Sequence, residues 1–208
     1  KELLKERREA NAGSIHPLPV DQAIAYALGT LPALGYFHTQ GLVYCDMKPD
    51  NVVLTGDGLR IIDLGGVRRI DDEEGAIYGT TGYQAPEVPV VGPSVASDIY
   101  TIGRTLTVLA MEFRGYQSTY VASLPPVDQT PLFEEHDSFY RLLLKACAPD
   151  PADRFVSADE MRVQLGRGVR RDPADDGVER CRRTPRFRRL DPGVPALRLA
   201  DPPLPSAR

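Results

Sequence analysis

The chain has no long apolar segment. No run in its 208 residues approaches the ~20 consecutive apolar residues that a membrane-spanning helix needs. Residues 1–10 are charged rather than apolar, so we expect no signal peptide there. The first residue is Lys rather than Met, which favours a piece of a longer protein. No membrane span is expected.

Cysteine is also scarce. The three cysteines, Cys45, Cys147 and Cys181, lie far apart and form no Cys-x-x-Cys pair, which argues against a zinc site. An odd, sparse set of cysteines favours reduced thiols rather than a disulfide framework. The sequence therefore predicts a cytoplasmic protein.

The overall composition excludes several protein classes. Apolar residues make up 42% of the chain and charged residues 26%, as in an average globular domain. These proportions exclude a collagen, a coiled coil, a disulfide-dense toxin and a wholly disordered chain. The length allows one or two domains with a sizeable core.

Charge divides the chain into two parts. Residues 1–166 hold 14 Lys+Arg and 23 Asp+Glu, whereas residues 167–208 hold 11 Arg, no Lys and 6 acidic residues. The second part also contains 7 of the 19 prolines and has no apolar periodicity, so we expect a disordered or irregular tail. Three interpretations stay open: a basic arm for nucleic acid or anionic lipid, a loose tail, or a stretch translated out of frame.

The folded part begins with a helix and a hairpin. Apolar residues recur every three or four positions over residues 21–38, which predicts an amphipathic helix with a kink or tight packing at Pro32. The β-like runs 51–54 and 59–64 flank Thr55-Gly56-Asp57-Gly58, a hairpin signal.

The second half of the folded part is mostly helical. Residues 65–93 are rich in Gly, Thr and Pro and predict a long loop, a feature that is often functional. Helices are predicted at residues 97–112, 139–146 and 158–165, the last with a capping box from Ser157 to Glu160. The expected class is α+β, mostly helical, with a small β-hairpin.

A series of short motifs suggests an active site. Asp46 is followed two residues later by Lys48 and five residues later by Asn51, and Asp63 begins Asp63-Leu64-Gly65. Further along the chain come Ala85-Pro86-Glu87, the pair Asp98 and Gly103, and Arg154. Each motif alone is weak evidence, but five in this order and spacing are strong evidence, because chance has to supply all of them.

Together these motifs resemble the C-terminal lobe of a serine/threonine protein kinase. Within this family, residues 18–165 resemble the actinobacterial protein kinase G type, in Leu42-Val43-Tyr44, Ile62-Asp63-Leu64-Gly65 and Gly82-Tyr83-Gln84-Ala85-Pro86-Glu87. The resemblance implies a partial kinase domain over residues 1–166 and does not cover the tail.

The resemblance also implies roles for individual residues in phosphoryl transfer. Asp46 would accept the proton of the substrate hydroxyl, and Lys48 would neutralise charge on the γ-phosphate. Asn51 and Asp63 would supply oxygen ligands to Mg²⁺ (or Mn²⁺). Thr80 would bridge Asp46 and Lys48, which in this family marks Ser/Thr acceptors.

ATP is the implied cofactor and a protein with a Ser/Thr acceptor the implied partner. Val53 and Ile62 would form an apolar floor under the adenine. The full set of expected ATP-binding residues is Asp50, Asn51, Val53, Ile62 and Asp63. Nucleic acid is not an expected partner, because residues 1–166 are acidic on balance.

Other polar residues are expected to be structural. By the resemblance, Glu87 and Arg154 form a buried pair that anchors the loop, and Asp98 caps the backbone of the catalytic loop. His38 and His136 are expected at the surface or in the core rather than as ligands. The acidic run 71–74 is interpreted as a solvated loop, or as a charge that repels acidic substrates.

The motifs depart from most kinases immediately before Asp46. Tyr44 and Cys45 replace the usual His-Arg, and that Arg normally binds a phosphorylated activation loop. Activity without loop phosphorylation is therefore expected, as the resemblance also implies. Cys45 is interpreted as an inert packed thiol, with a redox-active thiol as the alternative.

The small lobe of a kinase is not recognisable in the sequence. No Gly-rich loop and no Val-Ala-x-Lys strand precede residue 21, and neither a rubredoxin-like nor a tetratricopeptide module is found. We therefore expect this chain alone to transfer phosphate very slowly or not at all. The alternative function is a non-catalytic, pseudokinase-like docking module that binds a protein partner.

Overall fold

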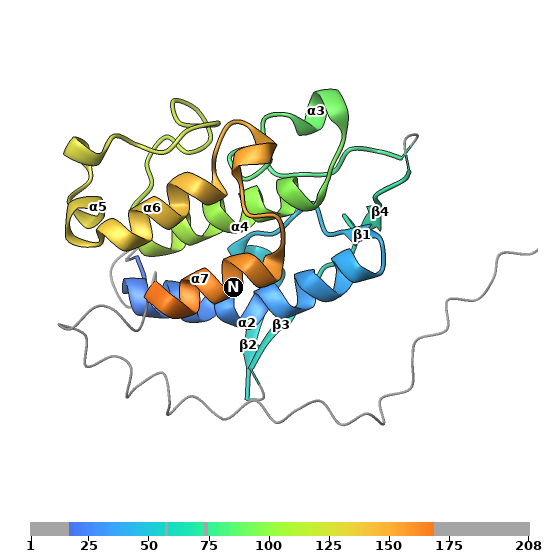
Figure 1. Ribbon diagram of the computed structural model, residues 1–208, viewed down its shortest axis with the longest axis horizontal. Coiled ribbons are helices and arrows are strands. Elements are labelled where there is room, and N and C mark those ends of the chain that lie inside the picture. The colour runs from blue at the N-terminus through green and yellow to red at the C-terminus, as the bar shows by residue number, and fades with distance from the viewer. Residues whose placement is uncertain (1–16, 57, 73–74, 169–208) are drawn as a thin grey trace, which may run out of the picture.

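The computed structural model describes residues 17–56, 58–72 and 75–168, and these residues form a mostly helical body with two small sheets (Figure 1). The predicted helical class with a minor β component is confirmed. The tail 167–208 lies outside the described residues except for its first two positions, as do residues 1–16. None of the helices in the described ranges is long and apolar enough to cross a membrane.

Helix α2, Val20–Thr39, confirms the first predicted helix. Its apolar stripe, which includes Ala27, Leu31 and Leu34, is buried in the main core. Asp21 lies in the first turn, where an acidic side chain complements the helix dipole. The helix packs against α7 and α4, and Pro32 lies within it without ending it.

Helix α4, Val95–Ala110, lies at the centre of the body and is buried around most of its circumference. It begins two residues before the predicted start, because Ser94 and Ser97 form a reciprocal capping box. The Ser97 N–H donates to Ser94 Oγ at 3.2 Å, and the Ser94 N–H donates to Ser97 Oγ at 2.9 Å. This cap fixes the entry into α4 and therefore the position of Asp98 in its first turn.

Strands β2, Val52–Thr55, and β3, Gly58–Ile61, form the predicted antiparallel hairpin. The predicted runs 51–54 and 59–64 do not match the strand bounds, since neither Asn51 nor Asp63 belongs to a strand. Asn51 closes the 3₁₀ turn η1, Pro49–Asn51, because its side chain bonds back to Asp46. Regular pairing ends at Ile61, although the Ile62 N–H still donates to Asn51 O at 3.0 Å.

The expectation of a continuous loop over residues 65–93 was also wrong in part. Strand β4, Arg68–Arg69, pairs antiparallel with β1, Leu42–Val43, and α3, Val88–Val91, is a short helix. Two-residue strands show no alternation in the sequence, and the partner of β4 lies far away along the chain.

The remaining helices close the core. They are η2 (Val127–Gln129), α5 (Pro131–Glu135), α6 (Asp137–Ala146), η3 (Pro151–Asp153) and α7 (Ala158–Gly168). In α7 only half of the predicted capping box is present. The Glu160 N–H donates to Ser157 Oγ at 3.1 Å, but the Glu160 carboxylate accepts from the N–H of Val156 instead of Ser157.

Candidate functional site

The segment 44–51 carries the predicted catalytic residues, and α4 holds its backbone in place. The carboxylate of Asp98, with none of its side chain exposed, accepts the N–H groups of Tyr44 at 2.7 Å and Cys45 at 2.8 Å. Thr105 donates to Met47 O at 3.0 Å from the next turns of the same helix. Asp98 therefore caps the backbone of this segment through two hydrogen bonds, as predicted.

Cys45 has a left-handed backbone conformation with a φ of 69°, which residues other than Gly rarely adopt. The two bonds to Asp98 on the flanking N–H groups hold this turn, which directs the next side chain, Asp46. Burial raises the pKa of the Cys45 thiol to about 12, with the nearby Asp98 contributing. A thiol held in its protonated form fits the packed interpretation rather than the redox one.

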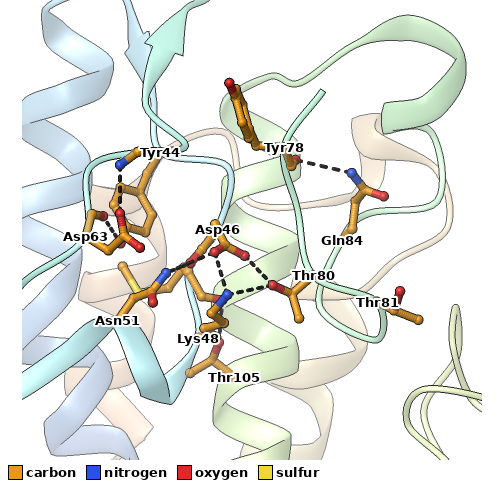
Figure 2. Close-up of polar contacts among 12 residues, drawn as sticks. Tyr44, Asp46, Lys48, Asn51, Asp63, Tyr78, Thr80, Thr81, Gln84 and Thr105 are labelled. Carbon is orange, nitrogen blue, oxygen red and sulfur yellow. Dashed lines mark hydrogen bonds and ion pairs between the residues drawn. The ribbon is translucent and has the colours of Figure 1, made fainter. Parts of the chain in front are cut away.

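Asp46, Lys48 and Thr80 form a closed triangle of hydrogen bonds (Figure 2). Lys48 Nζ donates to Asp46 Oδ2 at 2.6 Å and to Thr80 Oγ1 at 2.7 Å. Thr80 Oγ1 donates to Asp46 Oδ1 at 2.6 Å. The bridge by Thr80, which the resemblance implied, is therefore present, and it ties residue 80 to the segment 44–51.

Asn51 also contacts this carboxylate, at the same oxygen as Lys48. Its Nδ2 donates to Asp46 O at 2.8 Å and to Asp46 Oδ2 at 3.0 Å. Because the amide nitrogen makes both bonds, the amide oxygen is the atom that can ligate a cation. Asp46 is thus held by three side chains that arrive from two parts of the chain.

Asp63 follows β3 by two residues and is exposed. Its Oδ1 accepts the Gly65 N–H at 2.8 Å, and its backbone oxygen accepts the Tyr44 hydroxyl at 2.6 Å. Burial raises the pKa of Tyr44, so the hydroxyl remains a donor at neutral pH. Tyr44, which replaces the usual His, thereby ties Asp63 to the segment 44–51, and sequence reasoning missed this bond.

The expected adenine floor lies on the hairpin. Val53 comes two residues after Asn51, which pairs with Ile62, so Val53 and Ile62 share one face of the hairpin. Val53 is half-buried, and Ile62 is 54% exposed. Asp50 is exposed in η1. The structure thus leaves this apolar face open beside the polar site.

Both histidines lie near a carboxylate. His38 Nε2 lies 2.9 Å from Asp98 Oδ2, so His38 packs under the segment 44–51. His136 precedes α6 and lies 3.9 Å from Glu135. Within the described residues no group of three or more His, Cys, Asp or Glu could hold a metal ion.

Glu87 and Arg154 form the predicted buried pair. Arg154 Nη1 donates to Glu87 Oε1 at 2.6 Å and Nη2 to Oε2 at 2.8 Å, a bidentate arrangement. The Arg154 guanidinium also donates to the backbone oxygens of Ala148, Ala96 and Pro149 and lies over the ring of Tyr100. The pair anchors the Ala-Pro-Glu motif to the loop before η3.

Arg68 of β4 is a further structural residue that sequence reasoning missed. It donates to Gly75 O at 2.9 Å, to Ala76 O at 3.0 Å and to Asp72 O. Of the acidic run, Asp71 is exposed and pairs with Arg69, which lowers the pKa of the Asp71 carboxyl. Glu73 and Glu74 lie outside the described residues. No motif in the sequence marked Arg68.

Comparison with known proteins agrees with this geometry. The family profile of the protein kinase domain matches residues 3–162. "Serine/threonine-protein kinase PknG" of Mycobacterium leprae is 51% identical over 177 residues, which cover 84% of this chain and 23% of that protein. The PknG protein of Mycolicibacterium smegmatis is 51% identical over 165 residues, 78% of this chain and 21% of that protein.

More distant similarity extends to other bacterial kinases. "Probable serine/threonine-protein kinase PkwA" of Thermomonospora curvata is 32% identical over 162 residues, 72% of this chain and 21% of that protein. The chain thus spans about a fifth of the length of the curated relatives it matches. Because the family profile covers most of the chain, and because Lys48, Asn51 and Thr80 meet at Asp46, the chain belongs to the protein kinase family.

Proposed function

We propose that this chain carries the catalytic residues of a serine/threonine protein kinase, which transfers the γ-phosphate of ATP to a protein hydroxyl. The observation that carries the proposal is the triangle of Asp46, Lys48 and Thr80. It places a carboxylate, an ammonium group and a hydroxyl within hydrogen-bond distance of one another. Phosphoryl transfer needs mainly such positioning and charge neutralisation.

Asp46 is the residue that receives the acceptor hydroxyl. Its carboxylate is oriented by Asn51, Lys48 and Thr80, so it can align a Ser or Thr hydroxyl and accept its proton. Lys48 supplies a positive charge beside Asp46, where it neutralises the negative charge that builds up on the transferred phosphoryl group. The half-buried surroundings of both side chains strengthen this electrostatic contribution.

Asn51 and Asp63 fit a divalent cation of the Mg²⁺ or Mn²⁺ kind. Both offer oxygen atoms, the donors that hard cations prefer, and two protein ligands suffice when nucleotide phosphates complete the shell. When bound, the cation neutralises phosphate charge and holds the nucleotide. Val53 and Ile62 would contact the adenine, and Asp50, which is exposed in η1, is the remaining proposed ATP-binding residue.

The described residues correspond in this proposal to the C-terminal lobe of a kinase, with residues 1–166 as a partial kinase domain. The order of α2, the segment 44–51, the hairpin and the central helix α4 supports this assignment. Cys45 and Cys147 are free thiols, which fits the proposed cytoplasmic location.

We also propose that the enzyme works without phosphorylation of its activation loop. The residue before Asp46 is a buried Cys and offers no positive charge to a phosphate. Arg68 instead holds the loop through the backbone oxygens of residues 72, 75 and 76. Treatment with a protein phosphatase should therefore leave the transfer rate unchanged.

The test measures radiolabelled phosphate transfer from ATP to a protein acceptor. It uses the 208-residue chain alone, and then the same chain joined to the segment that precedes the matched region in the M. leprae relative. We expect very slow transfer by the chain alone and faster transfer by the joined protein. In the joined protein, Asp46→Asn should lower the rate by at least about 100-fold, because the base is lost.

Asp137→Asn is the matched control. Asp137 is 63% exposed, begins α6 and pairs only with Arg141 in the described structure, so the same chemical change there should leave the rate unaltered. Equal rates for the joined protein and its Asp46→Asn variant would refute the catalytic proposal. Binding of the acceptor without any transfer would instead favour the non-catalytic docking module.

A further inference from the structure

Arg104 in α4 is fully buried and has an unusual set of partners. Buried guanidinium groups normally pair with a carboxylate. Among the described residues no carboxylate pairs with Arg104, and its donors reach backbone oxygens instead. Nε donates to Gly82 O at 2.7 Å, Nη1 to Ser123 O at 2.5 Å, and Nη2 to Tyr116 O at 3.1 Å and Tyr120 O at 2.6 Å.

The bond to Gly82 reaches a tight turn that contains Thr80, the hydroxyl member of the triangle at the proposed catalytic centre. Within this turn, residues 80–84, the N–H groups of Tyr83 and Gln84 both donate to Thr80 O, at 2.9 Å and 3.1 Å. Gly82 lies between these donors and Thr80, so the turn moves as one unit. A displacement of Gly82 therefore displaces Thr80.

Helix α4 holds both sides of the triangle through two adjacent residues. Arg104 bonds to Gly82, and Thr105 Oγ1 donates at 3.0 Å to the backbone oxygen of Met47, which lies between the other two members of the triangle (Figure 2). The two bonds and the triangle together close a ring that runs from α4 through the segment 44–51 and the turn 80–84 back to α4. The helix thus sets the distance that the triangle has to span.

The other three acceptors fix the guanidinium itself. They belong to residues 116, 120 and 123 of the loop that follows α4, and the Phe113 ring covers the group at 4.8 Å from its central carbon. A guanidinium is planar and its donors point in fixed directions. Because a buried charge loses free energy when it gives up a partner without gaining water, the group cannot follow a displaced turn. Gly82 therefore keeps a fixed position relative to α4.

We propose that Arg104 is a positioning residue for the proposed phosphoryl transfer. By holding Gly82, it keeps Thr80 within hydrogen-bond distance of the Asp46 carboxylate, and it touches neither nucleotide nor acceptor. When Thr80 is displaced, Asp46 loses one donor and Lys48 loses one acceptor, so both groups are less well oriented. The proposal rests on the proposed kinase function and adds the residue that holds its centre in shape.

The first experiment measures hydrogen–deuterium exchange by NMR in the 208-residue chain and in its Arg104→Met and Arg104→Lys variants. The amides of Tyr83 and Gln84 should exchange at least about tenfold faster in both variants, as for the loss of one charge-assisted hydrogen bond. The reference amides are those of Tyr44 and Cys45, which Asp98 of the same helix holds. Their exchange should change by less than about twofold, because local opening is confined to the released segment.

The second experiment measures phosphate transfer in the joined protein. Arg104→Met should lower kcat by about 10- to 100-fold and leave the KM for Mg·ATP unchanged, because a misplacement of about 1 Å costs that much rate. In a Thr80→Ala background the same substitution should lower kcat by less than about twofold further, since the two residues act as one unit. A merely structural role would lower kcat equally in both backgrounds.

Gly82→Ala tests the same ring without changing Arg104. The residue has a φ of +88°, and a Cβ there would lie 2.7 Å from Tyr116 O, so the turn has to shift. This variant should reproduce the loss of kcat and the dependence on Thr80, and it takes the place of the Arg104 variants if these fail to fold. Met161→Ala is the control for general instability. Met161 is buried in the main core, so its variant should be destabilised but should keep the wild-type kcat.

Three results would overturn the proposal. The first is a folded Arg104 variant with the kcat of the wild-type protein. The second is a loss of kcat that is equally large in the Thr80→Ala background. The third is equal acceleration of exchange at all four amides. Absence of transfer by every joined protein, together with the expected exchange pattern, would refute the kinase function rather than the hold of Arg104 on the turn.

Discussion

Replacement of Glu87 by Gln should destabilise the protein by about 3 kcal/mol. Loss of one member of a buried ion pair costs about 3–5 kcal/mol, because the other charge stays buried and unpaired. Arg154 has no exposed side-chain surface, and Glu87 is its only carboxylate partner among the described residues. We expect the lower end of the range for two reasons. Gln keeps one acceptor oxygen, and three backbone oxygens still bind Arg154.

The assay is equilibrium unfolding in urea, followed by circular dichroism because the chain has no tryptophan. The matched control is Asp137→Asn, which breaks a bond of similar length to Arg141, 2.8 Å, at an exposed position. Exposed ion pairs are typically worth about 0.2–1 kcal/mol, so this variant should change little.

A double variant separates the pair from its surroundings. Arg154→Met combined with Glu87→Gln should cost less than the sum of the single changes, since the two groups are coupled. A Glu87→Gln variant that loses no more stability than Asp137→Asn would refute the reasoning. Strict additivity of the two single changes would refute it as well.

Three further predictions concern other parts of the body. In a Cys181→Ser variant, Cys45 and Cys147 should resist alkylation at pH 8 and should react once urea unfolds the protein, because burial raises the pKa of both thiols to about 12. Rapid alkylation of the native protein would contradict this prediction. Gly103→Ala should lower the free energy of unfolding in urea by about 1–3 kcal/mol, because the new Cβ would lie 2.6 Å from Cys147 Sγ, where α4 meets α6. An unchanged free energy of unfolding would show that the two helices can move apart at no cost. Glu160→Gln should destabilise the protein above pH 4.5 but not at strongly acidic pH. The Val156 N–H and Lys145 lower the pKa of the Glu160 carboxyl. The stabilisation of the folded protein by this carboxylate is therefore present above the ordinary pKa and is lost as the pH falls through the lowered value. An equal effect of the substitution on thermal unfolding at all pH values would exclude this linkage.

Local sequence patterns were sufficient for the main elements and for the motifs around Asp46. The apolar period over residues 21–38 predicted α2, since burial of one helical face depends on spacing within a single segment. The turn residues 55–58 predicted the hairpin for the same reason. The spacing of Asp46, Lys48 and Asn51 indicated the catalytic loop of a kinase, because these residues are close along the chain.

Contacts between distant segments were predictable only where the family resemblance supplied them. The bridge from Thr80 to Asp46 and the pair Glu87–Arg154 were expected on that ground. The pairing of β4 with β1 was missed, because strands of two residues carry no period. The site roles of Asp46, Lys48, Asn51, Asp63 and Thr80 stay predictions until transfer is measured.

By itself, the sequence identified the candidate site residues around Asp46 and the segments that form helices, since the motifs and the apolar periods both depend on local spacing. Only the tertiary structure decided how these residues are held. Arg104 looks like an ordinary charged residue in the sequence, yet in the fold it is buried and binds four backbone oxygens from two segments. Tyr44 likewise ties Asp63 to the segment 44–51, through a hydrogen bond between residues on either side of the hairpin. Backbone oxygens are present at every residue, so no sequence pattern marks which of them a buried side chain will bind; the packing of the chain makes that choice.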